Sequence, residues 1–324
     1  MSVKSYAEAI NEAHAQLLES DGRVFVIGQG VDSPWFVGTT TTGLAARFGD
    51  ARVIDTPVSE ACVTGSAIGA AMAGMRPIVF HPRMDFMYLA LDQIINHCAH
   101  WHYMFGGNVN VPVTIRGIIN RGNEQAAQHS QSPFALYTHI PGLKVVCPAS
   151  PYDAKGLLVS AVRDENPVLY IDDRWLYSLA EEVPDDLYGV PIGECRVCRR
   201  GSDVTIVAVS YLVREALEAA ESLESRGVSA EVIDPRTIKP LDTGTILDSV
   251  AKTRRLVIAD PDWKCCGFSE HVASVVLTEP RLSGISVQFV TLPDAPAPAS
   301  IVFEKAYFPS DTTISEAVER VLAG

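Results

Sequence analysis

Short runs of Val and Ile alternate along this chain with segments whose apolar residues recur every three to four positions. The runs predict strands, and the recurring segments predict helices. A regular alternation of the two is typical of parallel βαβ units. The sequence therefore predicts an α/β fold built on parallel sheets. Strands are expected at residues 24–27, 52–55, 77–80, 113–116, 144–147 and 168–171, then at 204–209, 230–233, 256–259 and 287–290.

An acidic segment rich in Pro and Gly, at about residues 176–193, separates the first six predicted strands from the last four. This composition favours a linker between domains. A chain of 324 residues has room for two domains, and we place them at residues 1–185 and 186–324. An amphipathic helix after Ser5 is expected to open the chain. Another is expected to close it, with Thr313 and Glu316 as its capping box.

Composition narrows the possible functions. A formal net charge of -13 makes a nucleic-acid surface unfavourable, since phosphate binding needs clustered Lys and Arg. The chain has no apolar run of bilayer length and no signal-peptide core at its start, so we expect no membrane contact and a cytoplasmic location. Seven scattered cysteines do not form a disulfide framework, and their two local pairs favour reduced thiols over a zinc site.

An acidic residue follows the second predicted strand, where the sequence reads RVIDTPVSE and ends at Glu60. The carboxyl edge of a parallel sheet is where α/β proteins bind ligands, so this position suits a functional acid. An acid in the first turn of a helix is also stabilised by the helix dipole, which is a purely structural explanation. The residues alone leave both interpretations open.

Two groups of histidines stand out. His129 lies among Gln and Ser in a predicted loop, where general acid–base chemistry is as plausible as a structural role. His97, His100 and His102 are closer together, but no carboxylate or Cys pattern accompanies them. They favour an interface or a partly buried helix end over a metal site.

Several familiar catalytic motifs are missing. The sequence has no P-loop, no GxSxG elbow and no HExxH motif, and the glycines around Gln29 are too few for a dinucleotide fingerprint. It also has no Gly-Asp-Gly segment followed about thirty residues later by Asn, which is the usual Mg-diphosphate cradle of thiamine enzymes.

Taken in order, the segments of the chain resemble the β-subunits of the first components of pyruvate, branched-chain and acetoin dehydrogenases. The resemblance covers nearly the whole chain, and its order makes it more specific than any single motif. The segments that carry it include AINEAHAQLLESDGRVFVIG, VIDTPVSE, GAAMAGMRPIVF, MDFMYLALDQIINHCA, MFGGNVNVPVTIRG, AAQHSQSPFAL, HIPGLKVVCPASPYDAKGLL, RDENPVLYI, EVIDPRTIKPLD and FEKAYFPS.

The resemblance implies a transketolase-like pyrimidine-binding domain followed by a transketolase C-terminal-like α/β domain. It also implies an enzyme that decarboxylates a small 2-oxo acid with thiamine diphosphate and passes the acyl group to a lipoyl acyltransferase. The active form would be an α2β2 heterotetramer, in which the α-subunit holds Mg2+ and shares the cofactor.

Family positions carried onto this sequence give roles to individual residues. Glu60 matches the glutamate that hydrogen-bonds the aminopyrimidine ring of the cofactor, Phe86 matches the aromatic residue packed on that ring, and His129 matches the active-site histidine. A potassium ion held by backbone carbonyls is also implied. Its matching positions are Val113, Ala161, Asp164 and Asn166.

The sequence departs from the family pattern in two places. Gln29 stands where most members have an acidic residue near the cofactor, so a proton relay that uses that carboxylate is in doubt. His81 and Arg83 precede Phe86 where typical members are more apolar. They could adapt the pocket to a more anionic or hydroxylated substrate, and neutral drift explains them about as well.

Two other functions remain open at this stage. One is a split thiamine diphosphate enzyme that forms acyloins or transfers carbon–carbon units as transketolase does. The other is a non-catalytic scaffold subunit that kept the fold, which the retention of Glu60, Phe86 and His129 disfavours.

Overall fold

A computed structural model describes residues 1–33 and 38–323, and Gly324, the end of the second predicted domain, lies outside them. The chain divides into two compact units. The first contains residues 1–120 and 136–192, and the second contains residues 121–135 and 193–324. The segment 121–135 therefore groups with the C-terminal part of the chain, although it lies within the first predicted domain. The predicted boundary between residues 185 and 186 stays a prediction.

The first unit is built on parallel strands in the order β6-β7-β5-β4-β2-β3. Strands β4, β5 and β7 are buried along their whole length, as expected for a parallel sheet covered on both faces. The six strands predicted for this part of the sequence are confirmed. They are β2 (Val24–Gly28), β3 (Val53–Asp55), β4 (Arg76–His81), β5 (Thr114–Ile119), β6 (Lys144–Val146) and β7 (Val168–Asp173).

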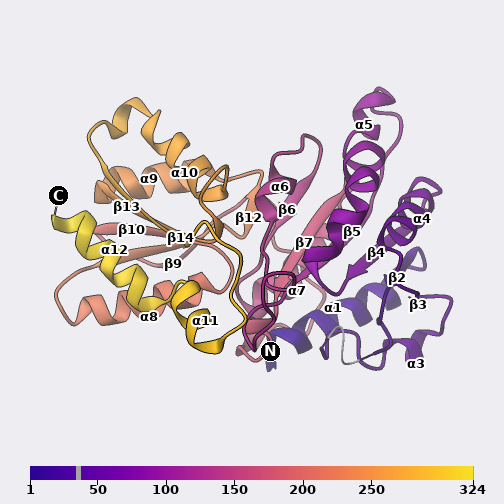
Figure 1. The fold of residues 1–324 in the computed structure, drawn as a ribbon. Coiled ribbons are helices and arrows are strands. Elements are labelled where there is room, and N and C mark those ends of the chain that lie inside the picture. The colour runs from indigo at the N-terminus through magenta and orange to yellow at the C-terminus, as the bar shows by residue number, and fades with distance from the viewer. Residues whose placement is uncertain (34–37, 324) are drawn as a thin grey trace. The chain divides into compact units, whose positions relative to one another are not determined.

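Helices cover this sheet, and Figure 1 shows its strands between α1 on one side and α4 and α5 on the other. The predicted cap of α1 is confirmed, because the Ser5 side chain accepts from the Glu8 backbone and the Glu8 carboxylate accepts from the Ser5 backbone. The helices are α1 (Tyr6–Ser20), α3 (Leu44–Phe48), α4 (Glu60–Met72), η1 (Met84–Ala90), η2 (Gln93–Ala99), α5 (Trp101–Met104), α6 (Phe134–Thr138), α7 (Pro151–Arg163) and η3 (Arg174–Leu176).

Part of the predicted linker is in fact a strand. β8 (Ala180–Val183) pairs antiparallel with β1 (Ser2–Ser5) in a separate two-stranded sheet. A linker along all of residues 176–193 is therefore wrong. The acidic side chains hid this short edge strand, because charged residues on an exposed strand break the usual apolar alternation.

The second unit has a sheet in the order β14-β13-β10-β11-β9, parallel except for β9, which runs antiparallel to β11. The four strands predicted here are confirmed as β10 (Val204–Ala208), β11 (Ala230–Asp234), β13 (Arg255–Trp263) and β14 (Ser286–Leu292). The remaining elements are β9 (Arg196–Arg199), β12 (Thr237–Lys239), α8 (Leu212–Glu224), α9 (Thr243–Thr253), α10 (Phe268–Leu277), η4 (Pro280–Leu282), α11 (Ile301–Tyr307) and α12 (Asp311–Ala323).

Helices α8 and α12 pack against each other below this sheet in Figure 1, and α9 and α10 lie above it. The predicted capping box of the last helix is wrong, because α12 begins at Asp311 and Thr313 already lies in its first turn. The Thr313 hydroxyl instead accepts from the Ser310 backbone N–H. Within residues 1–33 and 38–323, no helix is long and apolar enough to cross a membrane.

Candidate active site

The carboxyl edge of the first sheet brings the ends of β3, β2 and β4 together. Gly28 pairs with Asp55 on one side and with Phe80 on the other. A Cβ atom at Gly28 would lie 2.4 Å from the Phe80 carbonyl oxygen, so only glycine allows this approach. The Asp55 carboxylate then accepts from the backbone N–H groups of Gly30 at 2.6 Å and Val31 at 3.1 Å. This turn fixes the position of Gln29 at the sheet edge.

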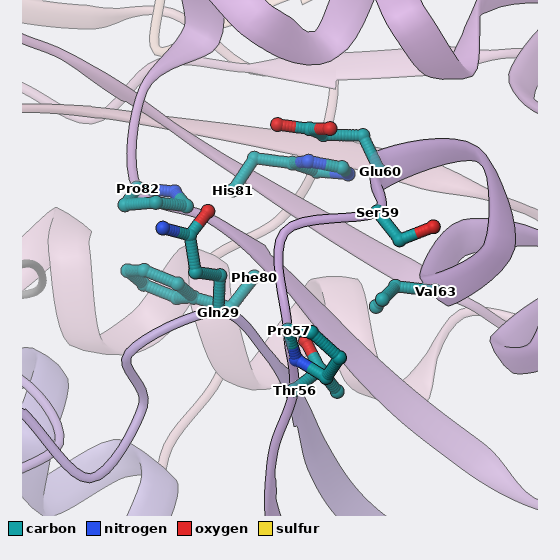
Figure 2. Close-up of a pocket in the computed structure, with 9 residues that line it drawn as sticks. All are labelled: Gln29, Thr56, Pro57, Ser59, Glu60, Val63, Phe80, His81 and Pro82. Atoms are coloured by element: carbon teal, nitrogen blue, oxygen red, sulfur yellow. The ribbon is translucent and has the colours of Figure 1, made fainter.

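Glu60 is the first residue of α4, directly after the loop that follows β3. Its half-buried side chain lines a pocket that also contains Gln29. Figure 2 shows Glu60 and His81 at the top of the pocket and Gln29 between Pro82 and Phe80. The lining residues are Gln29, Thr56, Pro57, Ser59, Glu60, Val63, Phe80, His81 and Pro82. The structure therefore brings two of the predicted site residues, Glu60 and Gln29, into one pocket.

His81 also lines this pocket, and it ends β4 with only 2% of its surface exposed. Its Nε2 lies 3.1 Å from the Thr64 hydroxyl on α4. Burial lowers the pKa of His81 to about 4, so the ring is neutral near pH 7. A neutral His81 can exchange hydrogen bonds with a ligand, but it adds no positive charge to the pocket.

Arg83 and Phe86 lie farther along the chain. Arg83 directly precedes η1 and is half-buried, and burial together with the nearby Arg174 guanidinium lowers its pKa. Phe86 lies within η1, half-buried, with its backbone N–H 3.3 Å from the Arg83 carbonyl oxygen. Neither residue lines the pocket of Glu60 among the residues that the structure describes.

His129 lies in the loop at residues 121–135, which belongs to the second unit, whereas Glu60 belongs to the first. Its side chain is half-buried, and its backbone N–H lies 3.3 Å from the Ala126 carbonyl oxygen. Three non-glycine residues of this loop, Asn123, Glu124 and Ala126, have positive φ angles. Such backbone costs energy and clusters at functional sites.

Hydrogen bonds join three residues of the predicted potassium site, Ala161, Asp164 and Asn166, whereas Val113 bonds to a neighbouring strand. The Val113 carbonyl accepts from Val168, and the Ala161 carbonyl accepts from Asp164 at the end of α7. The Arg76 guanidinium donates to the carbonyls of Val162 at 2.9 Å and Asp164 at 3.1 Å. A positive group thus already lies at this helix end, as the dipole favours.

Each of these carbonyls keeps a second lone pair, so the four predicted positions remain compatible with a hard cation. Asn166 is tied to the same helix end by its backbone N–H, which donates to the Asp164 side chain at 2.9 Å. The metal site predicted there stays a prediction. The histidine cluster offers no alternative, since no group of three or more His, Cys, Asp or Glu side chains in the described part of the chain could hold a metal ion.

Sequence reasoning missed two acids at the end of β13. Asp260 is fully buried and Asp262 is 3% exposed. Burial raises the pKa of Asp260 to about 6, and burial together with Asp260 raises the pKa of Asp262 to about 8. The available signal was the stretch ADPDW, in which two acids interrupt an apolar strand at its carboxyl end.

Comparison with known proteins places both units in one family. Residues 2–178 match the transketolase pyrimidine-binding domain, and residues 193–314 match the transketolase C-terminal domain. A solved structure described as a split gene transketolase, inactive beta4 tetramer, superposes with a TM-score of 0.81 at 25% identity. The match covers 98% of each chain.

Curated relatives are similar over nearly their whole length. The β-subunit of the acetoin:2,6-dichlorophenolindophenol oxidoreductase of Cupriavidus necator is 42% identical, with 98% of this chain and 96% of the relative covered. The β-subunit of the pyruvate dehydrogenase E1 component of Rickettsia felis is also 42% identical, with 97% of each chain covered. The chain therefore belongs to the family of β-subunits of thiamine diphosphate-dependent 2-oxo acid dehydrogenases.

Proposed function

We propose that Glu60 is the acid through which this β-subunit activates thiamine diphosphate, and that it acts only when an α-subunit completes the site. The observation that carries this proposal is the half-buried Glu60 side chain in a pocket with Gln29 at the carboxyl edge of the first sheet. Ligands of open α/β sheets bind at such edges.

The side chains that line the pocket suit the aminopyrimidine half of that cofactor by their chemistry. Its walls include the apolar side chains of Val63, Phe80 and Pro82, which suit the faces of a flat ring. Its polar groups, Glu60, Gln29 and His81, suit the ring nitrogens and the amino group at the edges. When bound, thiamine diphosphate supplies the electron sink for decarboxylation of a 2-oxo acid.

The work of this chain is then to hold the ring and to control one proton. With the cofactor bound, Glu60 would share a proton with a ring nitrogen, and Gln29 would offer a hydrogen bond without a proton to exchange. Phe86, which does not line the pocket in this structure, would pack against the ring, and His129 would handle protons near the reacting carbon or during acyl transfer. Because residue 29 is a glutamine, the site lacks the carboxylate that a longer proton relay would need.

The remaining parts of the proposal concern partners. The chain lacks the Gly-Asp-Gly to Asn cradle for Mg-diphosphate, so we assign Mg2+ and the diphosphate to the α-subunit of an α2β2 heterotetramer. A lipoyl acyltransferase would accept the acyl group. Potassium held by the carbonyls of Val113, Ala161, Asp164 and Asn166, and a cytoplasmic location, complete the proposal. Potassium binding is testable as a rise in melting temperature in KCl over equal NaCl.

The experiment reconstitutes this chain with an α-subunit and supplies thiamine diphosphate, Mg2+, small 2-oxo acids and a lipoyl domain. Decarboxylation with acylation of the lipoyl domain supports the proposal, and loss of both in Glu60→Gln assigns the proton to Glu60. Decarboxylation without acylation would instead favour a carbon–carbon transferase. Full activity in Glu60→Gln would leave only a scaffold role for the pocket.

A further inference from the structure

The loop that carries His129 adopts a backbone that its own sequence does not favour. Gly122, Asn123, Glu124 and Ala126 all have φ angles between 53° and 72°. Gly122 and Asn123 tolerate the left-handed region, but Glu124 and Ala126 carry its steric cost. Contacts from outside the loop must therefore hold this conformation.

One contact is made by Glu304, on the short helix α11. Its Oε2 accepts from the Glu124 backbone N–H at 3.2 Å, across 180 residues of sequence. Glu304 is only 4% exposed. Among the described residues, no hydrogen-bond partner reaches its Oε1. Burial of a carboxyl oxygen without a hydrogen-bond partner costs stability, so stability alone does not explain a glutamate here. This indicates that its hydrogen bond to the loop has another use.

Neighbouring contacts hold the same end of the loop. The Arg121 guanidinium carbon lies 3.3 Å from the centroid of the Tyr211 ring and 5.9 Å from that of Phe308, the residue after α11. The Tyr211 hydroxyl donates to the Pro309 carbonyl at 2.9 Å. The chain after α11 thus contacts both Arg121 and Tyr211, and Glu304 lies one helical turn before Phe308.

The other end of the loop is held by a second buried acid. The Asp262 side chain at the end of β13 accepts from the Ala135 backbone N–H and, at 2.8 Å, from the Trp263 N–H. In sequence, His129 lies between Glu124, which Glu304 binds, and Ala135, which Asp262 binds. The residues of both contacts belong to the second unit.

We propose that Glu304 is a positioning residue, whose hydrogen bond to Glu124 fixes the left-handed turn that places His129 for catalysis. This inference rests on the role proposed above for His129. It assigns a function to Glu304, which lies some 175 positions from His129 in sequence and does not line the pocket of Glu60.

The test compares two conservative variants that separate charge from reach. Glu304→Gln keeps the length of the side chain and an acceptor oxygen but removes the charge. Glu304→Asp keeps the charge but is one methylene shorter, so it withdraws the oxygen from Glu124. Glu221→Asp, on the exposed face of α8, is the matched control.

Two measurements are made on the full chain. Hydrogen exchange of peptides from residues 121–135 reports the loop without any cofactor, and kcat, KM and the pH profile are measured in the complex with the α-subunit. We expect Glu304→Asp to raise exchange in the loop and to lower kcat about tenfold, with KM for the 2-oxo acid nearly unchanged. Glu304→Gln should match the wild type in both measurements, because it keeps an acceptor for the Glu124 N–H. If a buried charge were required, Glu304→Gln would instead be impaired.

Unchanged exchange and unchanged kcat in Glu304→Asp would overturn the inference. So would equal losses in Glu304→Gln and Glu304→Asp, since charge or packing would then explain them. His129→Ala separates this result from the proposed function. If His129→Ala loses activity while Glu304→Asp does not, only the inference fails, and if His129→Ala keeps full activity, the role of His129 fails and the inference fails with it.

Discussion

The two sheets of this protein use their carboxyl edges differently. In the first unit, β2, β3 and β4 end at a pocket where Glu60 remains half-exposed beside Gln29. In the second unit, β13 ends in Asp260 and Asp262, which are buried and hydrogen-bonded to backbone N–H groups. Asp262 also accepts from the backbone N–H of Ala135, in the first turn of α6, so this acid holds the end of the segment 121–135.

This difference shows that the topological position alone does not decide function. Open α/β sheets bind ligands beyond the carboxyl ends of their strands. The first unit leaves this position open to a ligand, whereas the second uses it to hold its own chain. Acids at the first edge should therefore affect chemistry, and acids at the second should affect stability and loop position.

The largest effect is expected at the open edge. Glu60→Gln should lower turnover of the complex by about 10²–10⁴-fold, because it removes a positioned proton donor and acceptor. The free energy of unfolding should change by only about 0.5 kcal/mol, since the side chain is half-exposed. Turnover is measured with the α-subunit, and unfolding is measured by urea denaturation of the chain alone.

Glu221→Gln, on the exposed face of α8, is the control for this substitution. It should leave both turnover and stability at their wild-type values. A Glu60→Gln variant that destabilised the chain by several kcal/mol yet kept its turnover would reverse the contrast between the two edges.

The sequence predicted the strands of both sheets well, because buried parallel strands are continuous runs of Val and Ile. It also placed Glu60 correctly after a strand and at the start of a helix, since a strand end and a helix start are both local features. The exposed strands β1, β8 and β9 were missed, because their charged residues mask the strand pattern.

The loop of His129 shows what local patterns cannot predict. Its grouping with the second unit depends on contacts such as that between Glu124 and Glu304, which are 180 residues apart. No periodicity of the sequence encodes such a pairing. For the same reason the sequence drew no attention to Asp262, whose importance comes from its burial and from Ala135.

The second largest effect is expected beneath the open edge, where the first unit buries a charge pair. Arg116 and Asp172 are both fully buried, with two hydrogen bonds of 2.8 Å between them. Arg116 also lies 4.9 Å from the centroid of the Phe80 ring, which lines the pocket. Asp172→Asn should cost about 3–5 kcal/mol of unfolding free energy, because it leaves a buried guanidinium uncompensated.

Urea denaturation measures this cost, and Asp248→Asn provides a matched control. Asp248 pairs with Arg281 at 3.8 Å on the surface, so its loss should cost less than about 0.5 kcal/mol. Equal effects of the two substitutions would mean that the buried pair contributes no more than a surface one.

The third effect concerns the closed edge and depends on pH. The pKa of Asp262 is raised from its usual 3.8 to about 8, so the folded chain holds a proton that the unfolded chain releases. The stability that this proton provides is present below about pH 4 and is lost as the pH rises towards 8. Asp262→Asn removes the titration and keeps an acceptor for Ala135.

Unfolding free energy measured between pH 5 and pH 8 should therefore fall less steeply in Asp262→Asn than in the wild type. Between pH 5 and pH 8 the wild type should lose about 3–4 kcal/mol more than the variant, because the folded chain keeps the Asp262 proton over most of this range. Both proteins keep Asp260, whose pKa is raised to about 6. Its titration should produce part of the decrease in unfolding free energy that the variant still shows near pH 5. If unfolding free energy changes with pH equally in the two proteins, the Asp262 carboxyl is ionised over the whole range from pH 5 to pH 8, as expected for an acid at an open edge.

The smallest effect tests whether the open edge contains a neutral histidine. Thr64→Val removes the hydroxyl that lies 3.1 Å from His81 Nε2 and should cost about 1 kcal/mol of unfolding free energy, as one lost hydrogen bond does. Thr312→Val, on an exposed turn of α12, should cost less.

Because burial keeps the pKa of His81 near 4, the pH profile of turnover between pH 6 and pH 8 should be the same in Thr64→Val as in the wild type. A shift of that profile would mean that His81 titrates in this range and that the pocket of Glu60 admits a second proton-bearing group.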